Sequence, residues 1–566
     1  MGVILQAAYR RSRFINGKNI LVSVPSPADP ETPDADWWYD HIAKQAHELS
    51  NVGFTAVLLP PVCKTSSGSN ETADGYGIYD DYDIGSKNQF NSIPTRFGTR
   101  EQLQRACAIF RANGIDVYSD MVPHQRNGGR NGNYTYLRAD GKTGGRFSKH
   151  PSCFFGPHSQ GRVPRDPVAG PVSDDFSFGD ELCTVNSTPK EYVLNGLIDA
   201  GDWLTKTLDL QGYRIDDTKG QVSSSVLKWA TSKSMKGKVS IGEYDDGNPS
   251  NLNWWVWESG IGGHVYAFDF AIHYILEAMC NNGSSYDMRQ LDHAGLAGIS
   301  PMQAVTFVEN PDTDTDGFAT IVWNKILAYA YILTTEGYPM VYYRDYSTDE
   351  DCYKLKPGID NLIWIHENLA NGGTIYRWKD FQFVVFERTG EPNLLVGLNN
   401  DMYNGWKTVS VQTGFGSNVQ LHDYSGHAGD LWTDQNGRLT ISIPPNNNGN
   451  GYVCYSRAGI NPSKKTPPKP TTQYFFGADD LDIGPATPEL KSIGRIWCER
   501  ETEIDIELAD QFICEIIDAN GNNILGNKST GTVKLSGWHK INIQSKTTTK
   551  PFNLGVTYFS TQTLKK

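Results

Sequence analysis

The chain has 566 residues, a formal net charge of −13 and 38% apolar residues. This length exceeds what a single hydrophobic core usually holds, so we expect roughly two to four domains. No apolar run approaches the roughly 20 residues that would span a membrane. The acidic balance argues against a nucleic-acid partner, because binding of that kind depends on neutralising phosphates with Lys and Arg.

Short β-branched runs alternate with amphipathic stretches from the N-terminus to about residue 370. Strands are predicted at residues 3–9, 54–59, 115–122, 210–217, 238–244, 264–270, 304–310 and 338–344. Helices are predicted at residues 38–50, 100–113, 189–208 and 321–334. Strands separated by helices favour a parallel sheet, most simply closed as a (β/α)8 barrel. A doubly wound open sheet is the alternative, but no GxGxxG motif follows the first strand to support it.

One connection is far longer than the others. Residues 124–188 are rich in Gly, Asn, Arg, Ser and Pro and show little periodicity. So long a segment is more often a functional insertion than a linker. Because it follows the third strand, we expect it to rise from the C-terminal face of a barrel made by residues 1–123 and 189–371.

The pattern changes to period two after the barrel. Apolar and polar residues alternate around 374–378 and 394–398, which predicts an antiparallel β-sandwich over residues 372–458. Residues 459–472 contain the run SKKTPPKPTT, which is typical of a semi-extended linker. Alternation returns in residues 473–566, where we expect an additional C-terminal β-sandwich.

The cysteines and the N-terminus bear on where the protein works. The nine Cys are scattered, and no Cys/His cluster has the spacing of a zinc site. Buried, reduced cysteines are the simplest interpretation, although one or two disulfides stay open. The chain opens on a predicted strand rather than a signal peptide. We expect a secreted protein whose signal peptide has been removed, with a cytoplasmic protein as the alternative.

Three carboxylates stand at or just past the ends of predicted strands: Asp216, Glu243 and Asp312. Enzymes with a (β/α)8 barrel gather their catalytic groups at the strand ends on one face of the barrel. Two carboxyl groups that face one sugar ring are the usual means of breaking a glycosidic bond. Taken singly, Asp216 can be a helix N-cap, Glu243 part of an ion pair and Asp312 a turn residue.

Motifs in the same order along the chain point to one family. They are GYGIYDDYDIG at 75–85, FGT at 97–99, DVYSDMV at 116–122, GYRIDDTK at 212–219, GE at 242–243 and FVENPD at 307–312. Over roughly residues 1–457 the chain resembles the α-amylase family, glycoside hydrolase family 13, and in particular its liquefying and malto-oligosaccharide-forming members. The resemblance implies a (β/α)8 barrel, an inserted domain B after strand three and a β-sandwich domain C.

The resemblance also implies roles for individual residues. Asp216 takes the place of the nucleophile, Glu243 of the acid/base and Asp312 of the transition-state stabiliser. Arg214 lies two residues before Asp216 on the same strand, so it faces the same side and is expected to keep Asp216 ionised. Tyr76 is expected to lie beneath the sugar that is cleaved. A protonated acid/base requires a raised pKa, which we expect from burial and nearby carboxylates.

Several motif positions depart from the family pattern. His124 and Gln125 stand where the family has Asn and His, of which the Asn is normally a calcium ligand and the His holds the sugar. Pro311 replaces a His beside the third carboxylate, and Gly220 replaces a His after Lys219. The loss of several hydrogen bonds to substrate predicts altered specificity. Gln125, His124 and Lys219 remain the expected substrate-binding residues at these places, together with Arg214 and Tyr76.

Calcium is a cofactor that the resemblance implies, although an imidazole at position 124 does not suit it, because Ca²⁺ prefers oxygen ligands. Acidic residues of the insertion are the alternative ligands, and acidic loops are also commonly just solvated. These candidates are Asp166, Asp174, Asp175 and Asp180.

The sequence thus predicts a retaining α-glycoside hydrolase that acts on α-glucans or α-gluco-oligosaccharides through a covalent glycosyl-enzyme intermediate, with a non-standard linkage or substrate. A transglucosylase and a catalytically weak carbohydrate-binding homologue are the alternatives. We expect a monomer with an oligo- or polysaccharide substrate and neither nucleic-acid nor membrane partners. The last β-domain is a candidate carbohydrate-binding domain with Trp497 and Trp538 as platforms, unless both tryptophans belong to its core.

Overall fold

The computed structural model describes residues 2–8, 10–15, 18–23, 37–138, 141–156, 178–187, 189–315, 319–461, 471–476, 491–508, 510, 512–545 and 553–559. They divide into two compact units. The first unit contains residues 1–11, 51–56 and 244–465, and the second contains residues 12–50, 57–243 and 466–566. No helix among the described residues combines the length and the apolar character needed to cross a membrane.

The predicted (β/α)8 barrel is confirmed. Its strands close in the order β1-β14-β13-β12-β11-β10-β7-β4, which excludes the open doubly wound sheet. Every predicted strand is present, with shorter bounds at most ends. The strands are β1 (Val3–Gln6), β4 (Phe54–Leu59), β7 (Asp116–Met121), β10 (Gly212–Ile215), β11 (Val239–Gly242), β12 (Tyr266–Phe268), β13 (Ala304–Phe307) and β14 (Tyr338–Tyr342).

The barrel strands read as short apolar runs because both of their faces are covered. All residues of β1, β10 and β13 are buried. A strand of a barrel has one face towards the interior and the other towards the surrounding helices, so alternation is weak and continuous hydrophobic runs are the expected signal. The pairings of β1 with β14, of β10 with β7 and β11, and of β13 with β12 and β14 are all parallel.

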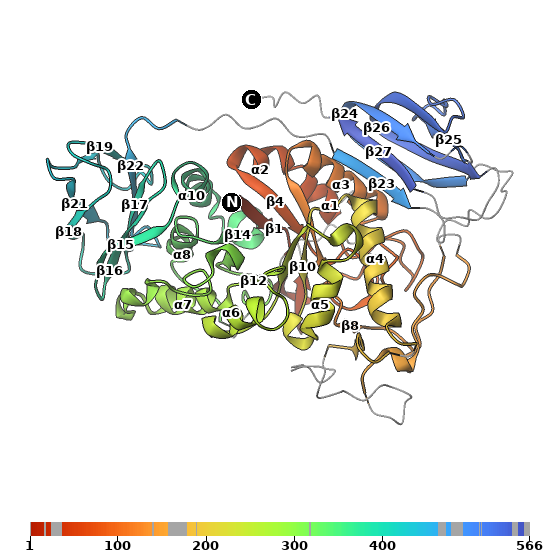
Figure 1. The fold of residues 1–566 in the computed structure, drawn as a ribbon, viewed down its shortest axis with the longest axis horizontal. Coiled ribbons are helices and arrows are strands. Elements are labelled where there is room, and N and C mark those ends of the chain that lie inside the picture. Colours follow the sequence, from red (N-terminus) through yellow and green to blue (C-terminus); the bar gives the residue numbers. More distant parts are fainter. Residues whose placement is uncertain are drawn as a thin grey trace. The chain divides into compact units, whose positions relative to one another are not determined.

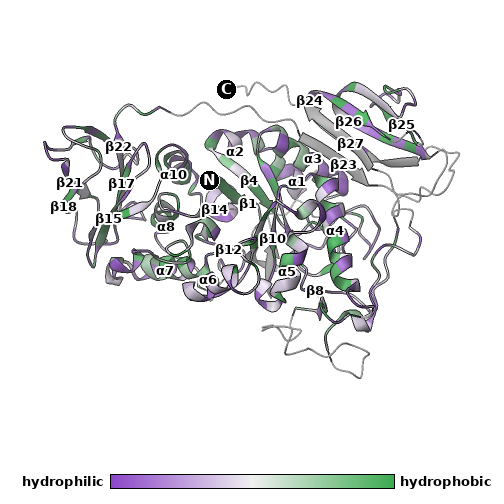
Figure 2. Cartoon of the chain, viewed as in Figure 1, coloured by the Kyte–Doolittle hydropathy of each residue, from purple (hydrophilic) through white to green (hydrophobic). Residues whose placement is uncertain are grey.

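Helices alternate with these strands along the chain (Figure 1). Helix α4 has hydrophobic and hydrophilic sides (Figure 2), and its buried residues include Leu197 and Trp203. Helix α3 begins at a capping box, in which Thr99 N donates to Gln102 Oε1 at 2.9 Å and Gln102 N donates to Thr99 Oγ1 at 3.3 Å. The helices are α1 (Trp38–Ala43), α2 (Ala46–Val52), α3 (Arg100–Ala112), α4 (Tyr192–Leu208), α5 (Ser223–Ala230), α6 (Pro249–Trp257), α7 (Phe270–Asn282), α8 (Lys325–Ile332), α9 (Tyr343–Tyr346) and α10 (Lys356–Leu369).

The single helix predicted at residues 38–50 is wrong in one respect, because two short helices, α1 and α2, occupy this stretch. Lys44 keeps a helical backbone and its N donates to Asp40 O at 3.2 Å, but Gln45 N donates to Ile42 O at 3.1 Å, a tighter turn that closes α1. Helices α4 and α8 also start later than predicted, at Tyr192 and Lys325. Periodicity locates these helices, but it does not mark where the chain turns within them.

The insertion after β7 is partly described. Strand β8 (Gln125–Arg126) pairs antiparallel with β9 (Asp180–Glu181), so the two ends of the insertion lie side by side. Phe154 and Leu182 form an isolated bridge next to this pair. Residues 157–177 lie outside the described part, and with them the candidate ligands Asp166, Asp174 and Asp175.

The region after the barrel is an antiparallel β-domain in the first unit. A six-stranded sheet has the order β15-β16-β17-β22-β19-β20, and β18 pairs with β21. Leu395, Val453 and Ile441 lie in its core, which both sheets share. The strands are β15 (Thr374–Lys379), β16 (Phe383–Arg388), β17 (Leu394–Asn399), β18 (Lys407–Gln412), β19 (Gln420–Asp423), β20 (Leu431–Trp432), β21 (Arg438–Ile443) and β22 (Tyr452–Arg457).

The last region forms one antiparallel five-stranded sheet, in the order β23-β27-β24-β26-β25, within the residues that the structure describes. The sequence predicts a two-sheet sandwich here, and the described residues form a single sheet. Trp538 is half-buried on β26, with the guanidinium of Arg105 5.4 Å from its ring centroid. The strands are β23 (Thr471–Phe476), β24 (Lys491–Glu507), β25 (Phe512–Ile517), β26 (Thr530–Ser545) and β27 (Asn553–Phe559).

All nine cysteines are free thiols, and only Cys63 is not fully buried. This agrees with the interpretation that they are buried and reduced, and no disulfide joins any of them.

The core of the β-domain after the barrel yields a stability prediction. Leu395 is fully buried among both sheets, whereas the Ile375 side chain on β15 is 46% exposed. We expect Leu395→Ala to lower the free energy of unfolding by about 2–5 kcal/mol, because it removes buried methyl groups and leaves a cavity. Ile375→Ala is the control, and we expect a much smaller loss from it. Equal losses in denaturant titrations would contradict this packing of the two sheets.

Candidate active site

The register of three neighbouring strands brings the first site residues together. Arg214 on β10 is the partner of Asp120 on β7 and of Ile241 on β11. Asp216 follows two residues later and therefore faces the same side as Arg214. Asp216 N donates to Met121 O at 2.8 Å, and Glu243 N donates to Ile215 O at 3.0 Å. These bonds continue the sheet up to both carboxylates, so the backbone of the barrel fixes their positions.

One guanidinium contacts three carboxylates. Nη1 of Arg214 lies 2.7 Å from Asp120 Oδ2 and 2.8 Å from Asp216 Oδ1. Nη2 of Arg214 forms an ion pair with Glu243. The Arg214 side chain is 4% exposed, so these interactions are poorly screened by water. The predicted contact between Arg214 and Asp216 is confirmed, and the same side chain also holds Glu243.

Burial governs the protonation of this group. It raises the pKa of Asp120 to about 6, against the opposing effect of Arg214. It also raises the pKa of Asp216 well above its usual value, and the neighbouring Glu243 adds to that rise. We expected Arg214 to keep Asp216 ionised; the guanidinium does act in that direction, but desolvation of the carboxylate outweighs it. The three carboxyl groups around Arg214 therefore retain a proton near neutral pH.

Backbone N–H groups hold Glu243 in place. Asp217 N donates to Glu243 Oε2 at 3.0 Å, and Thr218 N donates to Glu243 O at 2.8 Å. Both donors belong to the turn that follows β10. The acid/base candidate is therefore positioned by the same segment that carries the nucleophile candidate.

Tyr76 lies at this group from a different part of the chain. Its hydroxyl donates to Asp120 Oδ2 at 2.7 Å. The guanidinium carbon of Arg214 is 5.3 Å from the centroid of the ring, within cation–π range. Tyr76 is half-buried.

The other residues expected to bind substrate are His124, Gln125 and Lys219. His124 and Gln125 are 2% and 4% exposed, and Nδ1 of His124 lies 2.9 Å from Gln125 Oε1. Gln125 Nε2 donates to Tyr76 O at 3.4 Å, which links these two residues. Lys219 is half-buried in the short 3-10 helix η4 (Thr218–Gly220). His124 and Gln125 are thus engaged with other parts of the protein.

Asp312 belongs to the first unit and follows β13. Nη1 of Arg10 donates to Asp312 Oδ1 at 2.8 Å, while the Asp312 side chain stays 44% exposed. Asp312 N and Thr313 N both donate to Asn310 Oδ1, at 2.9 and 2.8 Å. The side chain of Asn310 therefore closes the turn that carries Asp312, and an arginine from β2 (Arg10–Ile15) orients its carboxylate.

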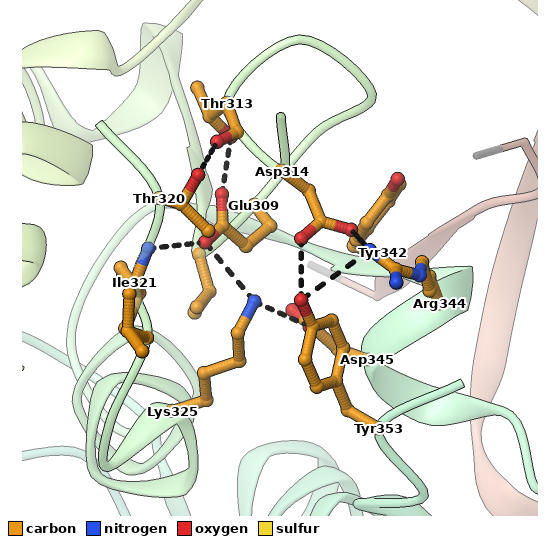
Figure 3. A network of polar contacts seen from close by, with 12 residues as sticks. Glu309, Thr313, Asp314, Thr320, Ile321, Lys325, Tyr342, Arg344, Asp345 and Tyr353 are labelled. Carbon is orange, nitrogen blue, oxygen red and sulfur yellow. Dashed lines mark hydrogen bonds and ion pairs between the residues drawn. The ribbon is translucent and has the colours of Figure 1, made fainter. Parts of the chain in front are cut away.

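A buried ion network anchors the start of the Asp312 segment (Figure 3). Lys325 Nζ donates to Glu309 Oε1 at 3.1 Å and to Asp345 Oδ1 at 2.8 Å. Glu309 also accepts from Ile321 N at 2.6 Å and from Thr313 Oγ1 at 2.5 Å. The Lys325 side chain is 5% exposed, and both carboxylates are fully buried. Glu309 thus connects Ile321 with Lys325, and Lys325 connects Glu309 with Asp345 on helix α9.

A second set of contacts fixes the middle of the same segment (Figure 3). Arg344 Nη1 donates to Asp314 Oδ2 at 2.5 Å, and the Tyr353 hydroxyl donates to Asp314 Oδ1 at 2.8 Å. Thr320 Oγ1 donates to Thr313 O at 2.6 Å. Because Asp312 lies between anchored neighbours on both sides, its backbone is held although its side chain is exposed.

Several of these residues were not identified from the sequence. Asp120 sits inside the first motif, and its place opposite Arg214 follows only from the strand register. Arg10 is 302 positions from Asp312 and Lys325 is 16 positions from Glu309, and neither carries a motif. One signal in the sequence could have identified a further site residue: Asp120 is a charged residue at the end of a buried strand.

Metal-ligand candidates are sparsely represented. Of the predicted ligands only Asp180 is described, and its Oδ2 accepts a hydrogen bond from the Tyr134 hydroxyl at 2.7 Å. Within the described ranges no group of three or more His, Cys, Asp or Glu side chains is placed to hold a metal ion.

The Lys325 network yields a prediction that depends on pH. Burial raises the pKa of Glu309 to about 7, and burial also raises the pKa of Asp345. We expect Lys325→Met to lower the free energy of unfolding by about 3–5 kcal/mol at pH 8, because two buried carboxylates lose their cation. The loss should be smaller at pH 5, since a carboxyl whose pKa is raised on folding takes up a proton below that pKa and no longer needs the cation.

The matched control is Lys356→Met, which breaks a partly exposed pair with Asp360. It should cost far less at either pH, because exposed ion pairs contribute about 0–1 kcal/mol. Denaturant titrations at pH 5 and pH 8 measure both variants. A Lys325→Met loss that is independent of pH would contradict the electrostatic interpretation.

Known proteins resemble this chain in sequence and in fold. A family model described as the α-amylase C-terminal domain matches residues 394–456, the part that contains β17 to β22. The chain is 29% identical over 479 residues to a glucan 1,4-alpha-maltohexaosidase of Bacillus sp. (strain 707), which covers 76% of this chain and 89% of that one. It is 27% identical over 457 residues to an alpha-amylase of Bacillus licheniformis, with 71% and 85% covered.

Among solved structures, a gamma-CGTase from alkalophilic Bacillus clarkii superposes with a TM-score of 0.57 at 16% identity, covering 96% of this chain and 79% of that chain. This similarity concerns the fold, and it agrees with the closed barrel followed by antiparallel β-domains. Together with the ordered motifs and the family model, these relatives show that the chain resembles the α-amylase family of glycoside hydrolases.

Proposed function

We propose that the protein hydrolyses α-glucosidic bonds of α-glucans or α-gluco-oligosaccharides with retention of configuration, through a covalent glycosyl-enzyme intermediate. The observation that carries this proposal is the shared guanidinium of Arg214, which binds both Asp216 and Glu243. Carboxyl groups that contact one guanidinium are close neighbours. Retaining enzymes need such closeness, about 5–5.5 Å between the two carboxyl groups, whereas inverting enzymes leave room for a water molecule.

The chemistry divides between these two residues. Asp216 attacks the anomeric carbon while Glu243 donates a proton to the leaving oxygen, and Glu243 then takes a proton from the water that releases the sugar. A proton must therefore reside on the carboxylate set before reaction. The raised pKa values of Asp120 and Asp216 indicate that this set retains a proton. The reaction requires that this proton lie on Glu243 while Asp216 is ionised. Arg214 and Asp120 act as positioning residues for the pair.

Asp312 is proposed as the third carboxylate, which binds sugar hydroxyls and favours ring distortion. Its half-exposed side chain supports this role, because the carboxylate remains available to a ligand while Arg10 orients it. Tyr76 is proposed as the platform beneath the cleaved sugar, since it is half-buried beside Arg214. Both assignments rest on the motifs that these residues occupy.

Substrate choice is proposed to differ from that of a typical α-amylase. The relatives with named activities are a maltohexaosidase and α-amylases, which supports an α-1,4-glucan as the first substrate to test. Gln125 and Pro311, however, replace two side chains that normally bind sugar hydroxyls. We also propose Lys219 as a residue on the leaving-group side, because it is half-exposed just after the nucleophile strand. Transfer to a sugar instead of water would use the same intermediate.

The proposal is tested by product analysis with two catalytic variants. We expect the protein to release sugars from at least one member of a panel of starch, pullulan, dextran and small α-glucosides. Asp216→Asn and Glu243→Gln should each lower kcat by at least about 10²–10⁴-fold, because nucleophilic attack or proton transfer is lost. Proton NMR of the first product should show the α-anomer.

Matched controls make the same chemical changes at exposed ion pairs. Asp199 pairs with Lys233, and Glu191 pairs with Lys228, with about half of each carboxylate side chain exposed. Asp199→Asn and Glu191→Gln should leave kcat unchanged. Absence of product from every α-glucoside, with Glu243→Gln indistinguishable from the parent, would favour a sugar-binding homologue. A β-anomer as first product would refute retention, and oligosaccharides longer than the substrate would indicate transfer.

A further inference from the structure

His124 and Gly220, two positions that depart from the family pattern, lie against each other in the structure. His124 is 2% exposed and lies between two carboxylates. Its Nε2 is 3.8 Å from Glu181 Oε1, and its Nδ1 is 3.5 Å from Asp217 Oδ2. Glu181 lies at the end of the insertion and Asp217 follows β10, so the imidazole sits where the insertion meets the barrel.

Gly220 makes room for this imidazole. A Cβ atom at position 220 would lie 2.9 Å from His124 Nε2 and 2.4 Å from Asp217 Oδ2. The backbone of Gly220 does not adopt the left-handed conformation that favours glycine, so close approach, and not backbone geometry, is the reason for a glycine here. Gly220 N also donates to Asp217 Oδ1 at 3.0 Å, which holds the turn against His124. A side chain at position 220 would therefore crowd both the imidazole of His124 and the carboxylate of Asp217.

This arrangement does not fit the calcium ion that the resemblance implies. Position 124 would supply an amide oxygen to Ca²⁺, which takes 6–8 oxygen ligands. Here the imidazole ring lies within 3.8 Å of Glu181 Oε1 and within 3.5 Å of Asp217 Oδ2, and Gly220 packs directly against it. The oxygen donors that would face a metal ion face an imidazole instead.

Other protein cations supply positive charge at the same junction. Asp81 forms ion pairs with Arg126, on β8, and with Lys149, whose Nζ is 2.8 Å from Asp81 Oδ2. The Arg126 and Lys149 side chains are 2% and 0% exposed. Arg126 Nη1 also donates to Val122 O at 2.6 Å and to Gln125 O at 2.5 Å. Burial alone would raise the pKa of Asp81. Arg126 and Lys149 hold this pKa below its usual value, so the carboxylate stays charged.

We propose that the junction between the insertion and the barrel is held without calcium: His124, seated against Gly220, occupies the place of the metal site, and Arg126 and Lys149 join the insertion to Asp81. The proposal concerns stability and does not depend on the proposed function. It accounts for His124 and Gly220 together, because a side chain at position 220 would crowd the imidazole.

Thermal unfolding of the full chain tests the metal. We expect the Tm of the unaltered protein to be the same in excess EDTA and in millimolar CaCl₂, since no calcium ion contributes to the folded state. A Tm that falls in EDTA and recovers on adding calcium would overturn the proposal. This measurement needs no variant, so it stands even if a substituted protein fails to fold.

A double-mutant cycle tests the steric link. Gly220→Ala should lower the Tm by several degrees, because its methyl group meets the imidazole. The same substitution in a His124→Ala background should cost less, since only the contact of the methyl group with Asp217 remains. Gly429→Ala is the matched control, because no atom lies within 4 Å of the place that its methyl group would take, and its Tm should be unchanged. Equal costs of Gly220→Ala with and without His124 would overturn the link between these two residues.

Discussion

The contact of one guanidinium with three carboxylates is the interaction on which the site depends. Arg214 lies between Asp120, Asp216 and Glu243, which come from three adjacent strands of the barrel. Without the cation, the buried carboxylates would repel one another, and the ends of β7, β10 and β11 would lose their common partner. With the cation in place, burial still raises the pKa values of Asp120 and Asp216, so the group of carboxylates retains a proton. General acid/base catalysis requires such a retained proton.

Buried cations hold carboxylates at several other places in the chain. Lys325 joins Glu309 and Asp345 in the first unit, and Lys149 reaches Asp81 in the second. Lys87 reaches the buried Asp80 in the same way. An ion pair of this kind adds little net stability compared with a well-packed apolar core, but removing one partner is costly. Such pairs therefore fix the course of loops that no secondary structure holds.

Sequence patterns predicted much of the fold. Apolar runs located the barrel strands, and period two located the β-domains, because both signals arise from side chains on a single element. The break between α1 and α2 was missed, since the pattern stays amphipathic across it. Asp216 and Glu243 were recognised from their motifs and do share one guanidinium. Asp120 was not recognised as a partner of Arg214, because that contact depends on the register between two strands.

The sequence by itself determined the order of strands and helices, the family and the identity of the candidate catalytic carboxylates. Only the tertiary structure decided how those carboxylates are charged, because desolvation depends on every segment that packs around them. It also showed that His124 and Gly220 are related. In the sequence they were two separate departures from the motifs. They form one feature because residues 96 positions apart come within contact distance, and such distances are set by packing and not by local pattern.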